Sequence, residues 1–492
     1  MGTRACTYSV HIHYKPYSLF LSIENHIKPA CNGNLTIILP VYPHIQNFTE
    51  RGSRVLFTNL PLELKSILEN CISDMNDNVQ LFCNNPGVDF TRDRKLGFTN
   101  LVSLILSMGS KGIRRELKKY FKNPKERANP NAFLKARKKL NNNVFPYLLE
   151  QFNKSSMSYD TRLYKGYQLL AVDGSDFSIA KNTDSESYID GEGNIMHLNA
   201  VCDIANNVFL AILIEPKSKC DERKACLTMI ENMTFPRKAI LTADRGYPDY
   251  EFFETINRKE NLDYLIRVPN KWSKATRSLP MKELDRDIVV EIRTTQRNED
   301  KEAYRNGTAT YLPGPSKFGK PKKEVAWTFG SPYKLSLRVV RFEIADGVYE
   351  TIITSLNRFE FPIKEIKKLY HKRWQIETNF RYLKYNMYAT HFHSKSEDFS
   401  IQEIYARIIM YNFSMRIMMN IEIKQKEEWK HFYQINFTNG FDACMKYWRY
   451  RGESPPDIIA DIQSEILPVR PGRKDKRKIK PKFFIPFLYR TA

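Results

Sequence analysis

The chain has 492 residues, more than one ordinary domain, and this length predicts about three units of ~150 residues each. With 42% hydrophobic and 13% aromatic residues it can form a sizeable core, which excludes disorder throughout. Lysine and arginine number 77 against 55 acidic residues, a formal net charge of +22. A surplus of this size indicates a polyanionic partner.

The cysteines, histidines and apolar segments suggest where the protein works. The eight cysteines are scattered without a C-x-x-C pair, which favours a reducing compartment. His391 and His393 form one close pair with no cysteine near it, so we expect a surface pair rather than a zinc site. The longest apolar stretches, Leu101–Met108 and residues 408–423, are too short or too interrupted to span a bilayer, so we expect no membrane partner.

Residues 1–55 have weak periodicity, and we assign them no structure or task. Residues 56–160 are expected to be helical, because two sets of apolar residues follow 3.6-residue spacing. These are Leu62, Leu64, Ile67 and Leu68, and then Leu101, Leu104, Ile105 and Met108. Lys111 to Lys139 holds twelve basic and two acidic residues, a composition that fits either a solvated helical face or a DNA-contacting surface.

Residues 161–270 predict the first part of a mixed α/β sheet. An apolar strand begins at Tyr167 and ends abruptly at Asp173, and two further strands, Met196–Ile204 and Val208–Ile214, complete a meander. Helices and strands then alternate: a helix near 221–232, a strand at 238–242 leading to Asp244, a helix near 249–258 and a strand at 264–268.

Residues 271–350 predict a β-rich insertion, in which the apolar alternation changes phase and indicates a bulge near Val339. Asp346-Gly347 predicts a hairpin turn. Residues 351–425 return to the core with a long helix from about Pro362 to Tyr385 and an apolar helix near 401–421. Residues 426–492 form a C-terminal region whose tail, Arg470 to Lys482, has eight basic residues and one acid.

Three carboxylates stand out as a candidate site. Asp173 and Asp244 follow strands that should be neighbours, although aspartates at strand ends are also common turn formers. On the long helix, Tyr370, Arg373, Glu377 and Lys384 share a stripe about 60° wide at the margin of the apolar face. Such a stripe is either a row of surface ion pairs or the wall of a cleft beside the sheet.

Converging carboxylates repel one another unless cations compensate, and oxygen ligands suit Mg²⁺ or Mn²⁺. Two such ions stabilise the entering and leaving oxygens of an in-line phosphoryl displacement. In a basic protein, the phosphodiester backbone is the matching substrate. The carboxylates Asp173, Asp244 and Glu377 are therefore candidate metal ligands and catalytic residues.

The motifs Asp173-Gly-Ser, Asp244-Arg-Gly-Tyr and Tyr370-x2-Arg373-x3-Glu377-x6-Lys384 resemble those of DDE transposases of bacterial insertion sequences, specifically the insertion-sequence-four family with its Y-R-E-K signature. The resemblance covers about Asp89 to Tyr411 and does not reach residues 1–55. Within it, the segment from Phe90-Thr-Arg to Lys139 resembles the DNA-binding region that precedes the catalytic core.

The resemblance implies an α/β fold: a ribonuclease-H-like mixed sheet with a β-rich insertion, preceded by a helical DNA-binding region. It implies two Mg²⁺ or Mn²⁺ ions on the three acids, and contacts from Tyr370, Arg373 and Lys384 to the phosphates of the transposon end. Arg245, beside Asp244, is a further candidate for DNA contact. Trp327 and Tyr349 are candidates for a base-stacking residue, although both fit the core better.

The predicted function is that of a DNA transposase that binds terminal inverted repeats, cleaves strands at the element ends and joins the 3′-hydroxyl ends to target DNA. The resemblance further implies a dimer in a paired-end synaptic complex with double-stranded DNA, in the bacterial cytoplasm and on the nucleoid when bound. Two alternatives stay open: a metal-dependent nuclease on the same fold without strand transfer, and a non-catalytic DNA-binding derivative.

Overall fold

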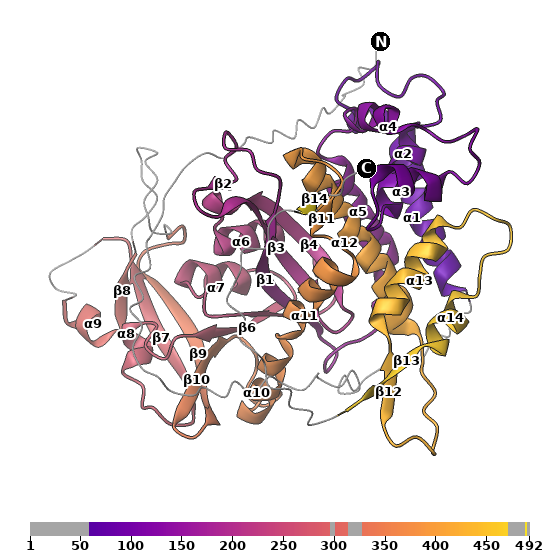
Figure 1. Ribbon diagram of the computed structural model, residues 1–492. Coiled ribbons are helices and arrows are strands. Elements are labelled where there is room, and N and C mark those ends of the chain that lie inside the picture. Colours follow the sequence, from indigo (N-terminus) through magenta and orange to yellow (C-terminus); the bar gives the residue numbers. More distant parts are fainter. Residues whose placement is uncertain (1–58, 296–300, 313–326, 471–487, 490–492) are drawn as a thin grey trace, which may run out of the picture.

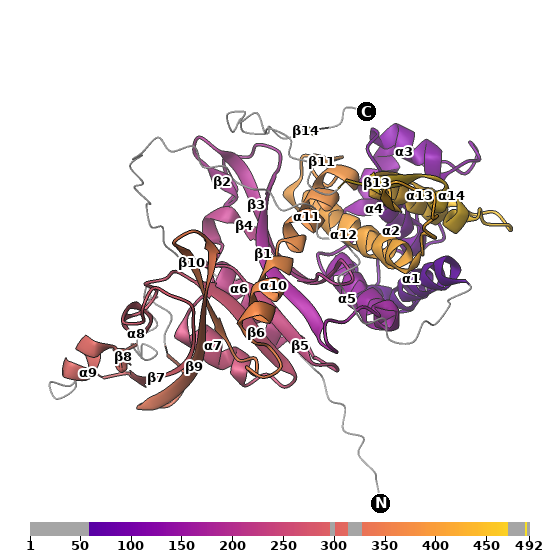
Figure 2. The same ribbon diagram turned by 90° about the horizontal axis from the view of Figure 1, so that it is seen from below.

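The structure is a computed structural model that describes residues 59–295, 301–312, 327–470 and the strand residues 488–489. Residues 1–55, to which no task was assigned, lie outside the described part, as does most of the basic tail from Arg470 to Lys482. Figures 1 and 2 show a central sheet with helices on both faces and an all-helical region to one side.

The centre is a ten-stranded mixed sheet with strand order β2-β3-β1-β5-β6-β10-β9-β7-β8, in which β4 pairs with β3 off this path. The strands are β1 (Gln168–Ser178), β2 (Tyr188–Ile189), β3 (Gly193–Asp203), β4 (Val208–Pro216), β5 (Ala239–Ala243), β6 (Leu262–Val268), β7 (Leu284–Arg293), β8 (Ala309–Tyr311), β9 (Tyr333–Ala345) and β10 (Val348–Thr354). Strand β3 is antiparallel to β1 and β4, whereas β5 is parallel to β1 and β6. This arrangement confirms the ribonuclease-H-like mixed sheet.

The strands from residues 271–350 continue this sheet instead of forming a second one. Strand β10 pairs with β6 of the core, and β9 and β7 follow in antiparallel order. The predicted hairpin at Asp346-Gly347 joins β9 to β10. The predicted bulge near Val339 is wrong, because the register shifts instead beside Val348. The apolar phase changes at Val339 because one end of β9 packs on one face of the sheet and its other end on the opposite face.

Fourteen α-helices surround the sheet in the described residues. They are α1 (Leu60–Asp77), α2 (Phe98–Ser107), α3 (Ile113–Tyr120), α4 (Pro130–Arg137), α5 (Val144–Ser156), α6 (Glu222–Glu231), α7 (Tyr250–Asn257), α8 (Lys274–Arg277), α9 (Lys301–Asn306), α10 (Ile363–Lys372), α11 (Gln375–Arg381), α12 (Glu397–Asn420), α13 (Phe437–Arg449) and α14 (Ile458–Ser464). Two small sheets complete the structure: β11 (His391–Phe392) with β14 (Leu488–Tyr489), and β12 (Phe432–Ile435) with β13 (Ile466–Val469).

Strand β1 is buried on both faces, as its uninterrupted apolar run requires. Leu170 and Val172 join the core beneath α6 and α7, whereas Leu169 and Ala171 join the larger core beneath α11 and α12. The sheet is therefore the middle of three layers. The part of β1 that follows Val172 lies between α6 on one face of the sheet and α11 on the other.

Helix α12 joins the central sheet to the helical region. It packs against β4 on one side and against α1, α2, α5 and α13 on the other (Figure 2). Two of its charged residues are buried and paired with residues of the helical region, Glu403 with Arg137 at 2.8 Å and Arg416 with Asp160 at 2.9 Å. No helix of the described residues is long and apolar enough to cross a membrane.

The surface prediction for the histidine pair is wrong for His393. Its side chain is fully buried, with Nδ1 2.9 Å from Glu403 Oε2 and Nε2 2.8 Å from the Lys111 carbonyl oxygen. His393 therefore helps to hold the loop before α3 against α12. Hydrogen bonds to both ring nitrogens account for its burial.

Candidate active site

The register of the sheet brings Asp173 and Asp244 together. The parallel pairing of β1 with β5 matches Gln168 with Ala239 and proceeds to Ala171 with Thr242. Two residues further along, the same offset sets Asp173 beside Asp244, which directly follows β5. Both side chains are partly exposed, in contrast to the fully buried strand residues before them.

The expectation that β1 ends at Asp173 is wrong, because β1 continues to Ser178. Its parallel partner β5 stops at Ala243, but its antiparallel partner β3 stays paired as far as Ser178 with Ile195. The backbone thus remains in a strand while the space beside it opens. Asp173 therefore lies within β1, at the point where β5 no longer pairs with it, and not at the end of the strand.

The expected long helix from Pro362 to Tyr385 is interrupted. Helix α10 ends at Lys372, Arg373 and Trp374 form a tight turn, and α11 is followed by a π-helical turn, Tyr382–Asn386. At the interruption, Arg373 N–H bonds to the Tyr370 carbonyl, three residues back instead of four. The predicted stripe is therefore divided: Tyr370 lies on α10, Glu377 on α11 and Lys384 on the π-helical turn. Arg373 lies in the turn between α10 and α11.

Arg373 joins two of the three candidate carboxylates. Its Nη1 lies 3.3 Å from Asp173 Oδ2 on β1, and its Nη2 lies 3.1 Å from Glu377 Oε1 on α11. Arg373 is 9% exposed, whereas the Asp173 and Glu377 side chains are 25% and 37% exposed. The sheet and the helix are thus held together at the point where the predicted acids meet.

The acids outnumber the cations at this point. The pKa of Asp173 is raised to about 6, mainly by burial; Arg373 opposes this rise, and the neighbouring Asp244 and Glu377 add to it. Burial also raises the pKa of Glu377, again against the effect of Arg373. Among the described residues, no group of three or more His, Cys, Asp or Glu side chains is arranged to hold a metal ion. Instead, the Arg373 guanidinium supplies positive charge to two of these carboxylates.

The other predicted residues lie around this centre. The Tyr370 hydroxyl is buried and has no hydrogen-bond partner among the described residues, and burial raises the pKa of Tyr370 to about 12. Lys384 donates from Nζ to the Asp176 carbonyl at 2.7 Å, so it too lies along β1. Arg245 is exposed, and so is His371. Trp327 is buried in the core, whereas Tyr349 is partly exposed.

Sequence reasoning missed two residues on the opposite face of β1, His197 on β3 and Glu222 on α6. A Cβ atom on Gly174 would lie 2.6 Å from His197 Cε1 and 2.9 Å from Glu222 Oε1. A Cβ atom on Gly246 would lie 3.1 Å from Asp244 Oδ1 and 3.7 Å from Glu222 Oε2. The glycines that follow Asp173 and Asp244 were the signal for this close approach.

His197 is held as a cation behind the site. Its Nδ1 lies 2.6 Å from Asp176 Oδ1 and its Nε2 lies 3.3 Å from Glu222 Oε1. Burial opposes the charge, but the Asp176 and Glu222 carboxylates raise the pKa of His197 to about 11. Burial also acts to raise the pKa of Asp176, but His197 and Lys217 lower it to about 2. Asp176 thus forms an ion pair with His197 and with Lys217.

Comparison with known proteins gives three likenesses. A family model described as "Transposase DDE domain" matches residues 164–413. The transposase InsG for insertion sequence element IS4 of Escherichia coli (strain K12) is 28% identical over 152 residues, 29% of this chain and 33% of that protein. The match therefore spans about a third of the relative's length.

A cryo-EM structure of a piggyBac transposase synaptic complex with hairpin DNA has a TM-score of 0.37 and 11% identity, and the match covers 86% of this chain and 88% of that chain. The match to the family model is the stronger finding. Residues 164–413 are about half of the chain and contain all three acids and the Tyr370-to-Lys384 motif. The chain therefore belongs to the transposase DDE domain family, and it is similar to a transposase of insertion sequence element IS4.

Proposed function

We propose that the protein catalyses DNA transposition: it binds the terminal inverted repeats of an insertion sequence, cleaves DNA strands at its ends and joins the 3′-hydroxyl ends to target DNA. The observation that carries this proposal is the meeting of Asp173, Asp244 and Glu377 around Arg373. Three acids from β1, the end of β5 and α11 converge there with a single arginine bonded to two of them. A strongly basic chain surrounds this acidic point.

We propose two Mg²⁺ or Mn²⁺ ions as the cofactor, with Asp173, Asp244 and Glu377 as the ligands. The residues fit this role because all are carboxylates, the donors that hard cations prefer, and because the charges of Asp244 and Glu377 act to raise the pKa of Asp173 and that of Asp244 acts to raise the pKa of Glu377. When bound, the ions would supply an activated water and stabilise the entering and leaving oxygens. Ions on the carboxylates would also allow Arg373 to bind a phosphate.

The neighbouring side chains are suited to hold the scissile phosphate. Arg373 can offer two parallel N–H groups to phosphate oxygens, and Lys384 offers an ammonium group further along β1. The Tyr370 hydroxyl, which is buried without a partner among the described residues, can donate to a further oxygen. Arg245 is exposed beside Asp244 and would contact the strand next to it.

The rest of the assembly is also a proposal. Residues 56–160 would form the DNA-binding region, 161–270 and 351–425 the two parts of the catalytic core, and 271–350 the insertion. Two copies would act as a dimer on paired ends, in the bacterial cytoplasm and at the nucleoid. The basic surface supports a DNA partner by charge complementarity.

The test is Glu377→Ala, assayed on a plasmid that carries the gene with its flanking DNA. We expect Mg²⁺-dependent cleavage to fall by roughly 10²- to 10³-fold, while DNA binding measured by gel shift is unchanged. Glu260→Ala, an exposed change on the same protein, is the matched control. Cleavage by Glu377→Ala at the wild-type rate would contradict the proposed catalytic site.

A joining assay separates the transposase from a nuclease on the same fold. A labelled DNA end with a free 3′-hydroxyl is incubated with a circular target, and joined product is expected. Cleavage without any joined product would favour the nuclease. Binding without cleavage in the wild type would favour the non-catalytic derivative.

A further inference from the structure

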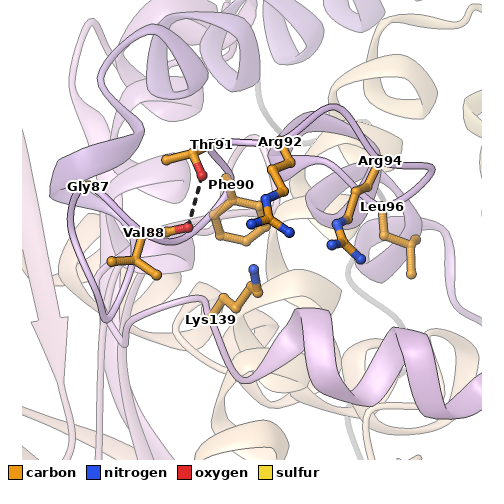
Figure 3. A pocket seen from close by; sticks show the side chains of 8 residues that line it. All are labelled: Gly87, Val88, Phe90, Thr91, Arg92, Arg94, Leu96 and Lys139. Carbon is orange, nitrogen blue, oxygen red and sulfur yellow. Dashed lines mark hydrogen bonds between the residues drawn. The ribbon is translucent and has the colours of Figure 1, made fainter.

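A cavity of about 470 Å³ lies in the helical region, between the α1–α2 connection and the residues that follow α4. Figure 3 shows its walls, which include Phe90, Arg92, Arg94 and Lys139. These residues lie outside the stretch 164–413 that the family model matches. The matched family model therefore assigns this cavity no role, although the cavity lies within the segment that resembles a DNA-binding region.

Three cations face the cavity, and two of them have no partner. Arg92 and Arg94 are exposed, and neither side chain forms a hydrogen bond or ion pair within the part of the chain that the structure describes. Lys139 pairs with Asp89 at 3.3 Å and lies 5.4 Å from the centre of the Phe90 ring. In Figure 3 the charged groups of Arg92 and Arg94 enter the space from one side and that of Lys139 from the other. The cavity therefore has a net positive lining.

The walls are fixed by a dense set of hydrogen bonds. Asp89 is 4% exposed and accepts two bonds from Asn85, from its backbone N and from Nδ2, at 3.1 Å each. Asn84 ties this loop to the other wall, because its N donates to the Lys139 carbonyl at 2.8 Å and its Nδ2 to the Lys138 carbonyl at 2.8 Å. The cavity is thus built before any ligand arrives.

Phe90 adopts a backbone conformation that is costly for a residue with a side chain. Its φ is 58°, in the left-handed region, while its ring makes an edge contact with Phe98 at 5.7 Å. Such strain persists only where surrounding contacts enforce it, and it is concentrated at ligand sites. Here it turns a partly exposed aromatic ring toward the cavity between the cations.

We propose that this cavity binds a phosphate of the DNA backbone, at a place separate from the acidic site. Arginine forks match phosphate oxygens, and two unpaired arginines with a lysine suit one or two backbone phosphates. The Phe90 ring offers an apolar surface to the deoxyribose that adjoins each phosphate, which a free phosphate ion lacks. The inference rests on the proposed function, since it requires a DNA partner.

The experiment compares Arg92→Ala/Arg94→Ala with Arg114→Ala/Arg115→Ala in the full chain. The second pair removes the same charge from exposed, unpaired arginines of α3 in the same helical region. Binding of a fluorescent duplex of arbitrary sequence is measured by anisotropy over a range of salt concentrations. We expect the pocket variant to lose about tenfold more affinity than the control and its salt dependence to be shallower by about one phosphate contact or more.

Equal loss in the two double variants would overturn the inference, because the arginines would then act only as bulk charge. Inorganic phosphate is the second probe, measured by calorimetry. Saturable binding of inorganic phosphate that needs Arg92 and Arg94, with no pocket effect on DNA affinity, would also overturn it. If the wild type cleaves DNA and Glu377→Ala does not, such results reject the pocket alone; a wild type that binds no DNA rejects both proposals.

Discussion

Two charge clusters in this protein, one buried and one partly exposed, differ in their ratio of acidic to basic side chains. At the junction of the helical region with α12, Glu403 accepts from Arg137 Nη1 at 2.8 Å and pairs with His393 at 2.9 Å. At the acidic site, Arg373 alone serves Asp173 and Glu377, with Asp244 beside them. In one cluster a single carboxylate contacts both an arginine and a histidine, whereas in the other three carboxylates share one arginine.

The pKa values show the consequence of this difference. Burial acts to raise the pKa of Glu403, but His393 and Arg137 outweigh it and lower it to about 2. At the acidic site burial raises the pKa of Asp173 to about 6, with only partial opposition from Arg373. A cluster whose carboxylate is compensated by basic side chains stabilises the fold, whereas a cluster with excess carboxylates is suited to bind cations.

The largest effect is expected from Glu403→Gln, which removes the charge that balances Arg137. Arg137 is fully buried and would be left without its ion pair. We expect the free energy of unfolding to fall by about 3–5 kcal/mol, measured by urea denaturation. Glu428→Gln, an exposed change, is the control and should be neutral. A loss below about 1 kcal/mol would mean that the cluster is not what holds this junction.

Acid should remove the same contribution without a mutation. Because folding lowers the pKa of Glu403 from 4.5 to about 2, its stabilisation is complete above pH 4.5 and is lost as the pH falls towards 2. We expect ionised Glu403 to contribute about 3 kcal/mol to the free energy of unfolding. The stability difference between the wild type and Glu403→Gln should therefore shrink over this range. A constant difference would show that the charge of Glu403 is not involved.

Gly174→Ala tests the packing behind the acidic site. The new methyl group would meet His197 and Glu222, so either β1 or these side chains must shift. We expect a loss of about 1–3 kcal/mol in unfolding free energy, together with slower DNA cleavage because Asp173 moves with the strand. Gly330→Ala is the matched control, since nothing lies within 4 Å of its added Cβ atom. If Gly174→Ala cleaves DNA at the wild-type rate, the packing of His197 and Glu222 against Gly174 does not affect the position of Asp173.

The smallest effect on stability is expected from Glu377→Gln, the counterpart of Glu403→Gln at the acidic site. The amide oxygen can still accept from Arg373, while repulsion from the neighbouring aspartates is removed. Thermal unfolding should show stability unchanged or raised by up to about 1 kcal/mol. If Glu377→Gln lost as much stability as Glu403→Gln, the two clusters would not differ in their contribution to the fold.

Much of the fold followed from local patterns. The apolar run ending at Asp173 predicted β1, the turn at Asp346-Gly347 predicted the β9–β10 hairpin, and the periodicity after Leu60 predicted helices. The break at Arg373–Trp374 was missed, because the apolar spacing continues across it without a proline or glycine. The burial of His393 was missed because its partner Glu403 is on another element.

The sequence by itself determined which residues are the candidates for the chemistry: Asp173, Asp244 and the spaced set from Tyr370 to Lys384 stand out because strand ends and helical spacing are local properties of the chain. Only the tertiary structure decided what these residues touch. Arg373 meets Asp173 across 200 positions, and Arg137 meets Glu403 across 266. Periodicity tells which face of an element is buried, but the partner on that face depends on how distant elements pack.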